Sequence, residues 1–404
     1  MISLSKETAR YSLRNLKQSR ARSALTILSI FVGIMTIFIF VSFGWGLYDY
    51  VNAFAGESSA DKISIMTKGG GAPGIDDTFV LTDEDLRAIE RVSGVYETEG
   101  LYTKVAEIKQ RDTKKFTFAI GYEPEKALVW ELANIKILKG RDLKSGDKGK
   151  VVLGYNYLID DKIFPNKLDL NSKITIQGED FRVIGFVESV GNPQDDAQIY
   201  MLQTDIKDLY GKKIKGYNWI IAKVNKENIP TIIDHVERNL RQSRNLDSGK
   251  EDFYVQSWQE MLETYTNVLN GIVGFIILIA LISVFVSAIN TANTMITSVL
   301  ERTREIGVIK SIGARNSEIF GIFLFESGVL GFTAGIVGVW FGFCLTYIAG
   351  ELLTNLGWGF LSPHYSISLF VGCILFATIT GAISGAIPAY RASRINPVEA
   401  LRYE

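Results

Sequence analysis

Four long apolar segments stand out in the pattern of hydrophobic and polar positions along the chain. They cover residues 24–47, 269–299, 319–349 and 366–387, and each carries almost no charge. About 20 apolar residues are needed to cross the hydrocarbon core of a membrane as a helix. The pattern therefore predicts four transmembrane helices. Helices buried in a soluble core are the disfavoured alternative, because each segment is apolar and almost uncharged over its whole length.

The stretch between the first two apolar segments, residues 48–268, has the pattern of a soluble α+β domain. Short β-branched or aromatic runs predict strands at 62–66, 104–109, 115–122, 150–154, 173–177, 181–188, 198–202 and 218–224. Helical periodicity predicts helices at 81–92 and 229–242, and Thr82 with Asp85 forms a capping box at the start of the first. A third helix from residue 256 runs directly into the second apolar segment. The Gly-rich run 68–74 is predicted to be a loop.

Residues 1–23 form a basic segment with helical periodicity. One face carries Lys6, Arg10, Arg14 and Lys17, and another carries Ala9, Leu13 and Leu16. This pattern predicts an amphipathic helix at the surface of a membrane that contains anionic lipid. A cleavable signal peptide is excluded because the apolar segment that follows is longer than the apolar core of such peptides.

The basic residues in the short flanks predict the orientation in the membrane. Lys and Arg number six in residues 1–23, four in 300–318 and three in 388–404, whereas 350–365 contains none. Basic flanks remain cytoplasmic. Both termini and the 300–318 segment are therefore expected in the cytoplasm, and the 48–268 domain and the 350–365 loop are expected outside a cell membrane.

Composition excludes several classes of protein. A net charge of −1 gives no sign of a cationic surface for nucleic acid. The mean hydropathy is positive, at +0.14, although 22% of the residues are charged, so the chain combines ordinary soluble sequence with very apolar segments. Cys344 and Cys373 lie inside apolar segments, and there are only two histidines, so neither a disulfide framework nor a metal site is expected. His235 and the pair Asp195–Asp196 are interpreted as solvated surface. With no nucleophile–base set, the chain is not expected to be an enzyme.

Glycine spacing in the third apolar segment predicts close helix packing. The five positions, Gly328, Gly331, Gly335, Gly338 and Gly342, are separated by steps of three and four and share one helical face. Small residues let helices approach closely in lipid. We expect a tight bundle and association of two such bundles through this stripe.

Polar residues inside the apolar segments are costly in a membrane and point to specific contacts. Glu326 is expected to pair with a basic residue of the 300–318 segment. The second apolar segment holds Asn290, Thr291, Asn293 and Thr294, for which hydrogen bonds between helices are expected.

The charged segment 300–318 separates the second and third apolar segments. Its Ile306, Ile309 and Ile312 recur at a spacing that gives one apolar stripe, and Gly313 follows as a helix-ending residue. A short amphipathic helix of this kind is expected to dock in a groove of a cytoplasmic partner.

Two motifs at the cytoplasmic side resemble a known family. They are ERTREIGVIKSIGA at 301–314 and GAISGAIPAYRASRINPVEALRYE at 381–404, and both are similar to MacB/FtsX-type ABC transporter permeases. GRDLKSGDKGKVVLG (140–154) and FRVIGFVE (181–188) resemble the periplasmic core domain of the same family. The resemblance extends from the N-terminal basic helix to the last residue.

The resemblance implies a type VII ABC architecture, in which two permease protomers work with a dimeric cytoplasmic ATPase. No G-x-x-x-x-G-K-[ST] motif occurs in the chain, so the ATPase, with its ATP and Mg²⁺, is expected in a separate chain and no cofactor in this one. Two copies of this chain are expected rather than two different permeases. The implied ATPase contact comprises Glu301, Arg302, Arg304, Glu305, Gly307, Lys310 and Gly313.

Relatives of this type transmit ATP-driven motion to their external domain, for efflux, lipoprotein release, peptide resistance or hydrolase activation. An extracytoplasmic partner or substrate is therefore expected, and its identity stays open. The alternative is a membrane sensor whose external domain binds a ligand and signals to a cytoplasmic partner without ATP. The two differ in the neighbouring gene, which would encode an ATPase or a kinase.

Overall fold

The computed structural model describes residues 20–53, 59–68 and 78–402. The chain forms two compact units, one of Met1–Leu47, Val268–Leu352 and Leu361–Glu404, the other of Tyr48–Asn267 and Leu353–Phe360. We call them the helical unit and the external unit. The predicted amphipathic helix at 1–23 falls almost wholly outside the described residues, and so does most of the predicted loop at 68–74.

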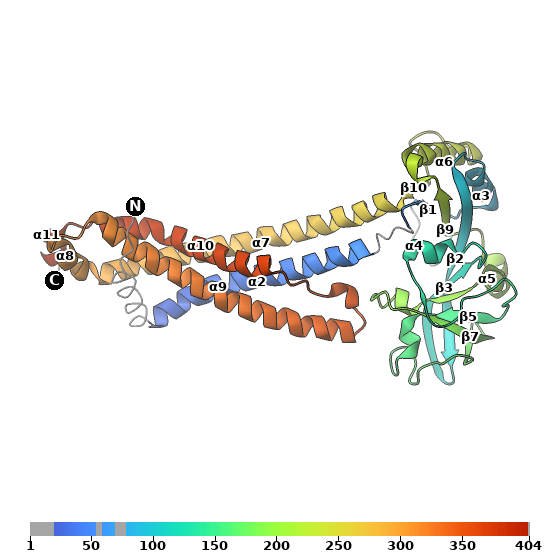
Figure 1. Cartoon of the computed structure of the whole chain (residues 1–404), viewed down its shortest axis with the longest axis horizontal. Coiled ribbons are helices and arrows are strands. Elements are labelled where there is room, and N and C mark those ends of the chain that lie inside the picture. Colours follow the sequence, from blue (N-terminus) through green and yellow to red (C-terminus); the bar gives the residue numbers. More distant parts are fainter. Residues whose placement is uncertain (1–19, 54–58, 69–77, 403–404) are drawn as a thin grey trace. The chain divides into compact units, whose positions relative to one another are not determined.

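The helical unit contains the four predicted apolar helices (Figure 1). They are α2 (Arg20–Ala53), α7 (Trp258–Glu301), α9 (Asn316–Asn355) and α10 (Ile367–Ser393). All four are long and apolar enough to cross a membrane. Ile34 and Phe38 of α2 pack with Ala334 of α9 and Ala377 of α10, so three of the four helices share one apolar core.

Two helices extend beyond the predicted spans. The start of α7 is fixed by a capping box, in which Ser257 Oγ accepts from the Glu260 amide (3.1 Å) and the Glu260 carboxylate accepts from the Ser257 amide (2.8 Å). From that start α7 is a single helix to Glu301, which confirms the predicted continuity of the 256–269 helix with the second span. The helix α10 continues through Pro388 to Ser393, six residues past the predicted end at 387, and buries Ala389 and Ala392.

Two short helices follow the long ones at the same end of the helical unit (Figure 1). The helix α8 (Thr303–Ser311) lies between α7 and α9 in sequence, and α11 (Pro397–Arg402) follows α10. The 300–318 segment is therefore a helix with two short connections.

The described residues of the external unit form ten strands. They are β1 (Lys62–Thr67), β2 (Val95–Gln110), β3 (Thr113–Tyr122), β4 (Ile137–Gly140), β5 (Lys150–Leu153), β6 (Lys173–Ile176), β7 (Glu179–Val187), β8 (Ile199–Leu202), β9 (Trp219–Val224) and β10 (Phe253–Ser257). The strand order is β10-β1-β9-β2-β3-β8-β5-β7-β4. Because β6 pairs with both β2 and β7, the strands β2, β3, β8, β5, β7 and β6 close into a ring.

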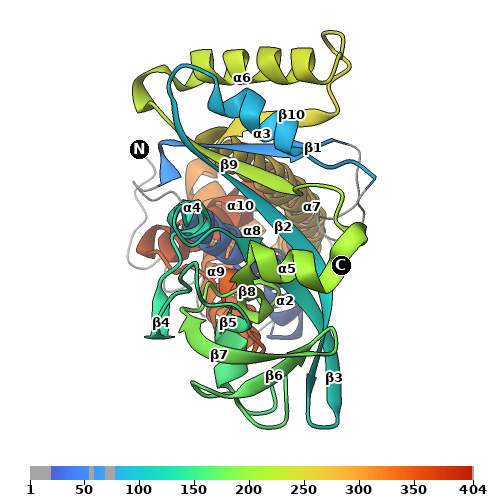
Figure 2. The same ribbon diagram turned by 90° about the vertical axis from the view of Figure 1, so that its right-hand side faces the viewer.

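The long strand β2 joins the two parts of this sheet. Its first half, to Leu101, pairs with β9, and its second half, from Tyr102, pairs with β3. The helices α3 (Asp83–Glu90) and α6 (Ile229–Ser243) lie together near the β10-β1-β9 end, as Figure 2 shows. Two further α-helices in the described part of the unit are α4 (Leu128–Ala133) and α5 (Gln203–Tyr210).

All eight predicted strands and both predicted amphipathic helices of this domain are present. The capping box of Thr82 and Asp85 is formed in both directions. The elements β4, β10, α4, α5 and the first half of β2 were not predicted from the sequence. These elements are short or mixed in polarity, and they are stabilised by neighbours that are distant in sequence, so local periodicity does not reveal them.

Candidate functional site

The helix α8 is fixed to the rest of its own chain along one side. Ile306 is only 3% exposed and packs with Met295, Ile319 and Phe323. Gly307 lies against α11, where an added Cβ would come within 2.7 Å of the Ala400 Cβ. A side chain at position 307 would therefore push α8 and α11 apart.

Lys310 ties α8 to the end of α10. Its Nζ donates to the carbonyl oxygens of Ser393 (3.0 Å) and Ile395 (2.7 Å). These carbonyls lie where α10 ends and lacks partners for its last acceptors, and a cation is favourable at the negative end of the helix dipole. A displacement of α8 would therefore pull directly on the end of the fourth long helix.

Arg302 ties the start of the same segment to α9. Its guanidinium lies 3.2 Å from a carboxylate oxygen of Glu326 and 3.2 Å from one of Glu305, and it stacks over the Phe323 ring. The predicted pairing of Glu326 with a basic residue of the 300–318 segment is thus present. Arg302 and Glu326 are 15% and 4% exposed, so a charge pair is enclosed at this junction.

The opposite side of α8 faces away from the chain. Arg304, Val308 and Ile312 follow one another at four-residue spacing and are all exposed, Ile312 to 81%. We call these three residues the outer face of α8. The predicted docking stripe of Ile306, Ile309 and Ile312 was wrong for Ile306, which is buried inside its own chain, and Ile309 is half-buried. Only Ile312 of the three is freely available.

The structure thereby separates the predicted ATPase-contact residues into two groups. Glu301, Arg304 and Glu305 are exposed, whereas Arg302, Gly307 and Lys310 make the internal contacts described above. Gly313 has a φ of +106° and follows the last turn of α8, so it ends the helix as predicted. Contact of any of these residues with an ATPase stays a prediction.

The sequence reading did not identify α11 as part of this surface. Val398 and Leu401 on α11 are 74% and 46% exposed. The sequence did carry a signal for α11, because Asn followed by Pro, at 396 and 397, is typical of a helix start. In the structure the Asn396 side chain accepts from the Val398 amide (3.1 Å). The exposed apolar surface beside α8 therefore includes two residues of the C-terminal tail.

The glycine stripe of α9 is used largely within one chain. An added Cβ would meet α10 at Gly331 (2.4 Å from the Ala377 oxygen) and at Gly335, and it would meet α2 at Gly338 and Gly342. These four glycines therefore allow α9 to approach two neighbouring helices closely. Their predicted part in association between protomers remains a prediction.

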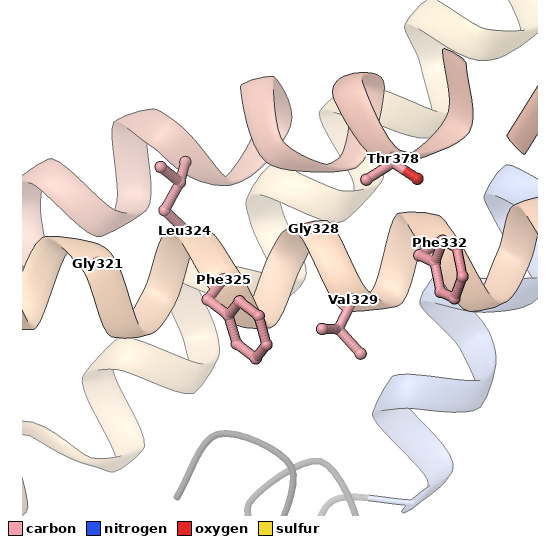
Figure 3. A pocket seen from close by; sticks show the side chains of 7 residues that line it. All are labelled: Gly321, Leu324, Phe325, Gly328, Val329, Phe332 and Thr378. Carbon is pink, nitrogen blue, oxygen red and sulfur yellow. The ribbon is translucent and has the colours of Figure 1, made fainter. Parts of the chain in front are cut away.

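Gly328 differs from the other members of the stripe. An added Cβ there would meet only the Ala382 Cβ, at 4.0 Å. Gly328 lines an apolar groove of about 450 Å³ with Gly321, Leu324, Phe325, Val329, Phe332 and Thr378, as Figure 3 shows. This part of α9 has room for another apolar element.

The polar residues of α7 fulfil part of their predicted role. Asn290 donates to the Ser29 hydroxyl of α2 (3.3 Å), which is a hydrogen bond between helices. The hydroxyls of Thr291 and Thr294 instead donate to backbone carbonyls four residues earlier in α7. Ser287, which had not been singled out, donates to the Ser29 carbonyl (2.6 Å).

In the external unit, His235 is exposed as predicted, but the interpretation of Asp195–Asp196 as solvated surface was wrong. Asp196 is 2% exposed and accepts from the Ser189 hydroxyl and the Val190 amide, each at 2.7 Å. Burial raises the pKa of both carboxyls. The pair anchors a turn, which sequence pattern alone could not distinguish from a solvated one.

Comparison with known families agrees with a membrane-spanning part and an α+β domain in one chain. Residues 277–397 match the family described as FtsX-like permease C-terminal, and residues 23–239 match the MacB-like periplasmic core domain. The chain is therefore an ABC transporter permease of the MacB/FtsX family: a multi-pass membrane protein with four long apolar helices and a periplasmic or extracellular α+β domain between the first and second.

Several known proteins are similar to this chain over almost its whole length. An uncharacterized ABC transporter permease, MJ1507 of Methanocaldococcus jannaschii, is 32% identical over 398 residues, covering 98% of this chain and 97% of the relative. The uncharacterized ABC transporter permease YknZ of Bacillus subtilis is 25% identical, and the match covers 98% of this chain and 99% of YknZ. The macrolide export ATP-binding/permease protein MacB of Nitrobacter winogradskyi is 28% identical, but this chain spans only 60% of its length.

Proposed function

We propose that this permease couples ATP hydrolysis by a separate cytoplasmic ATPase to movement of its external domain. The observation that carries the proposal is the attachment of α8. Its inner side holds α9 through Arg302 and α10 through Lys310, while its outer face of Arg304, Val308 and Ile312 is exposed. A partner that displaces α8 would therefore act on two long helices together.

The continuity of α7 supports transmission to the external domain. The helix runs without a break from Trp258, directly after strand β10, to Glu301, directly before the α8 segment. A continuous helix transmits displacement better than a flexible loop, because its backbone is hydrogen-bonded at every turn. In this proposal, motion at α8 reaches the external domain through α7 and does not require a substrate path between the helices.

The proposed topology has both termini and residues 300–318 in the cytoplasm, with residues 48–268 and 350–365 outside. The basic flanks support it, and so does the 350–365 loop. In that loop Phe360 donates its amide to the Gly191 carbonyl (3.0 Å), and Asn355 accepts from Lys162 Nζ (3.1 Å). These contacts are possible only if the loop and the domain lie on the same side of the membrane.

The proposed assembly contains an ATPase dimer and two copies of this chain. Two relatives that match over nearly their whole length, MJ1507 and YknZ, are described as permeases, and this chain has no phosphate-binding motif of the Walker A type. These two facts support an ATPase supplied by another chain. The substrate or partner of the external domain is not part of the proposal.

The test is co-purification with the cognate ABC ATPase, followed by measurement of ATP hydrolysis in proteoliposomes. The double variant Arg304→Ala/Val308→Ser should weaken the stimulation by the permease, because it removes two of the three side chains of the outer face without disturbing Arg302 or Lys310. The matched control, Arg87→Ala/Tyr96→Ser, removes an exposed cation and an exposed ring from the external domain and should retain stimulation.

Undiminished stimulation by the double variant would contradict docking of the ATPase on the outer face of α8. If the unchanged chain neither bound nor stimulated the ATPase, the ATP-independent sensor would be the better explanation.

A further inference from the structure

Three cationic side chains form one row across neighbouring strands of the closed ring. Lys150 of β5 and Lys173 of β6 are each in register with Arg182 of β7. Directly opposed residues on paired strands have neighbouring side chains on the same face, and like charges in such positions destabilise a sheet. This cation row therefore costs the fold stability unless an anion lies among its members.

The cation row lines a pocket of about 420 Å³. The other lining residues are Lys148, Gly149, Asp180 and Phe181. In Figure 2, β5, β6 and β7 lie together at the end of the external unit opposite α6. The volume falls within the range of small-molecule sites in proteins, which is roughly 300–1,000 Å³.

Two carboxylates near the pocket are already paired with cations, and a third, Asp180, is bonded to a neutral hydroxyl. Asp147 accepts from Lys150 Nζ (2.6 Å) and from Arg141, whose hydrogen bond holds the pKa of that carboxyl well below its usual range. Asp208 pairs with Lys148 (2.6 Å), and Asp180 accepts from the Thr175 hydroxyl (2.9 Å).

The central and outermost members of the row are left without an acidic partner. Within the described part of the chain, no carboxylate oxygen lies within 4.0 Å of the Lys173 or Arg182 side-chain nitrogens. Both side chains are exposed to the pocket opening. Two positive charges are therefore available to an incoming anion.

We propose that this pocket binds a phosphate group, with Arg182 as the principal contact and Lys150 and Lys173 beside it. The planar guanidinium donates two parallel hydrogen bonds to phosphate oxygens, and the ammonium groups supply further positive charge. A phosphate carries more charge than a single carboxylate and so matches a row of cations better. The group belongs either to a small soluble phosphate compound or to the headgroup of an anionic phospholipid. The proposal does not depend on ATP coupling.

The test is calorimetric titration of the full chain in a phosphate-free, non-ionic detergent with two probes. Pyrophosphate represents the soluble source, and dihexanoyl phosphatidic acid represents the lipid headgroup. At least one should bind saturably, and its affinity should fall as salt is raised. Arg182→Gln and Lys173→Gln should each weaken that probe about tenfold or more, as expected for the loss of one charge-assisted contact.

Lys250→Gln is the control, because it removes the same charge from an exposed pair with Asp247 away from the pocket. It should leave the affinity within about twofold, since an exposed ion pair contributes little. The melting temperature of Arg182→Gln without a probe should be unchanged or higher, because like-charge repulsion is relieved.

Binding of pyrophosphate alone would support a soluble ligand, and binding of the lipid probe alone a headgroup. The proposal would be overturned if neither probe saturated, if Arg182→Gln bound as tightly as the unchanged chain, or if Lys250→Gln weakened binding equally. A lower melting temperature for Arg182→Gln would also contradict it, because the row would then be stabilising.

Discussion

Arg302 and Glu326 form an enclosed ion pair, with 3.2 Å between Nη1 and Oε2, that joins the start of the α8 segment to the interior of α9. Glu326 is the one acidic residue within the third predicted span, and Arg302 covers it together with Phe323. A carboxylate in this position is costly without a cation, because charges are poorly solvated away from water. The pair therefore explains both why Glu326 is tolerated and how the segment is held.

Glu326→Leu should destabilise the helical unit by about 3–5 kcal/mol, because the enclosed Arg302 charge loses its buried carboxylate partner. The measurement is the free energy of unfolding in detergent. Arg302→Met combined with Glu326→Leu should recover most of the loss, since two apolar side chains can replace a buried pair. Glu305→Leu serves as the control, because Glu305 is 60% exposed and its contact with Arg302 should contribute less than about 1 kcal/mol. A stable Glu326→Leu single variant would contradict this account of the pair.

Gly331→Ala should lower the free energy of unfolding by about 1–3 kcal/mol, because the new methyl group would overlap the Ala377 carbonyl of α10. Gly274→Ala on α7 is the matched control, since its added Cβ meets nothing within 4 Å. That variant should be neutral or stabilised by up to about 1 kcal/mol, which is the helix preference of alanine over glycine. Equal effects of the two substitutions would mean that α9 and α10 do not pack through the stripe.

Gly328→Leu tests whether the glycine stripe also serves association of two protomers. Of the five glycines, it is the one whose added Cβ would meet no atom of its own chain closer than 4.0 Å, and it borders the apolar groove, which has room for a larger side chain. The variant should therefore fold normally but lower the dimer fraction, measured by mass photometry in nanodiscs. Gly372→Leu on α10, where nothing lies within 4 Å, should leave the fraction unchanged. An unaltered dimer fraction in Gly328→Leu would place the interface elsewhere.

Glu99 should make the stability of the external unit depend on pH. It is fully buried, and desolvation raises its pKa from 4.5 to about 7, although the Glu123 and Val129 amides donate to it. Between these values the folded state keeps the proton while the unfolded state loses it. Stability contributed by this group is therefore present below pH 4.5 and is lost as pH rises to about 7.

Glu99→Gln should remove this dependence. Relative to the unchanged chain, the variant should gain about 2–3 kcal/mol in unfolding free energy between pH 5 and pH 8, the equivalent of two pKa units. Denaturant titrations at the two pH values measure this difference. A constant difference between variant and unchanged chain across the range would show that Glu99 titrates normally.

The local elements of this chain were largely readable from sequence because each carries its own signal. The apolar helices needed only length and hydropathy, and α3 needed only Thr82 and Asp85 at its start. The elements that were missed, such as α5 and β10, are short, so their conformations depend on packing against distant strands more than on their own residues. The burial of Asp196 was missed for the same reason, since its partners come from the tertiary arrangement of one turn.

The sequence by itself determined that the chain has four apolar helices, that a charged segment at 300–318 lies between the second and third, and that an α+β domain lies between the first two. Hydrophobicity and charge act locally, so their pattern along the chain was sufficient for this. Only the tertiary structure decided which residues of 300–318 face inward. Ile306, Gly307 and Lys310 share a helix with Arg304 and Val308, and their difference arises solely because α9, α10 and α11 pack against one side of it.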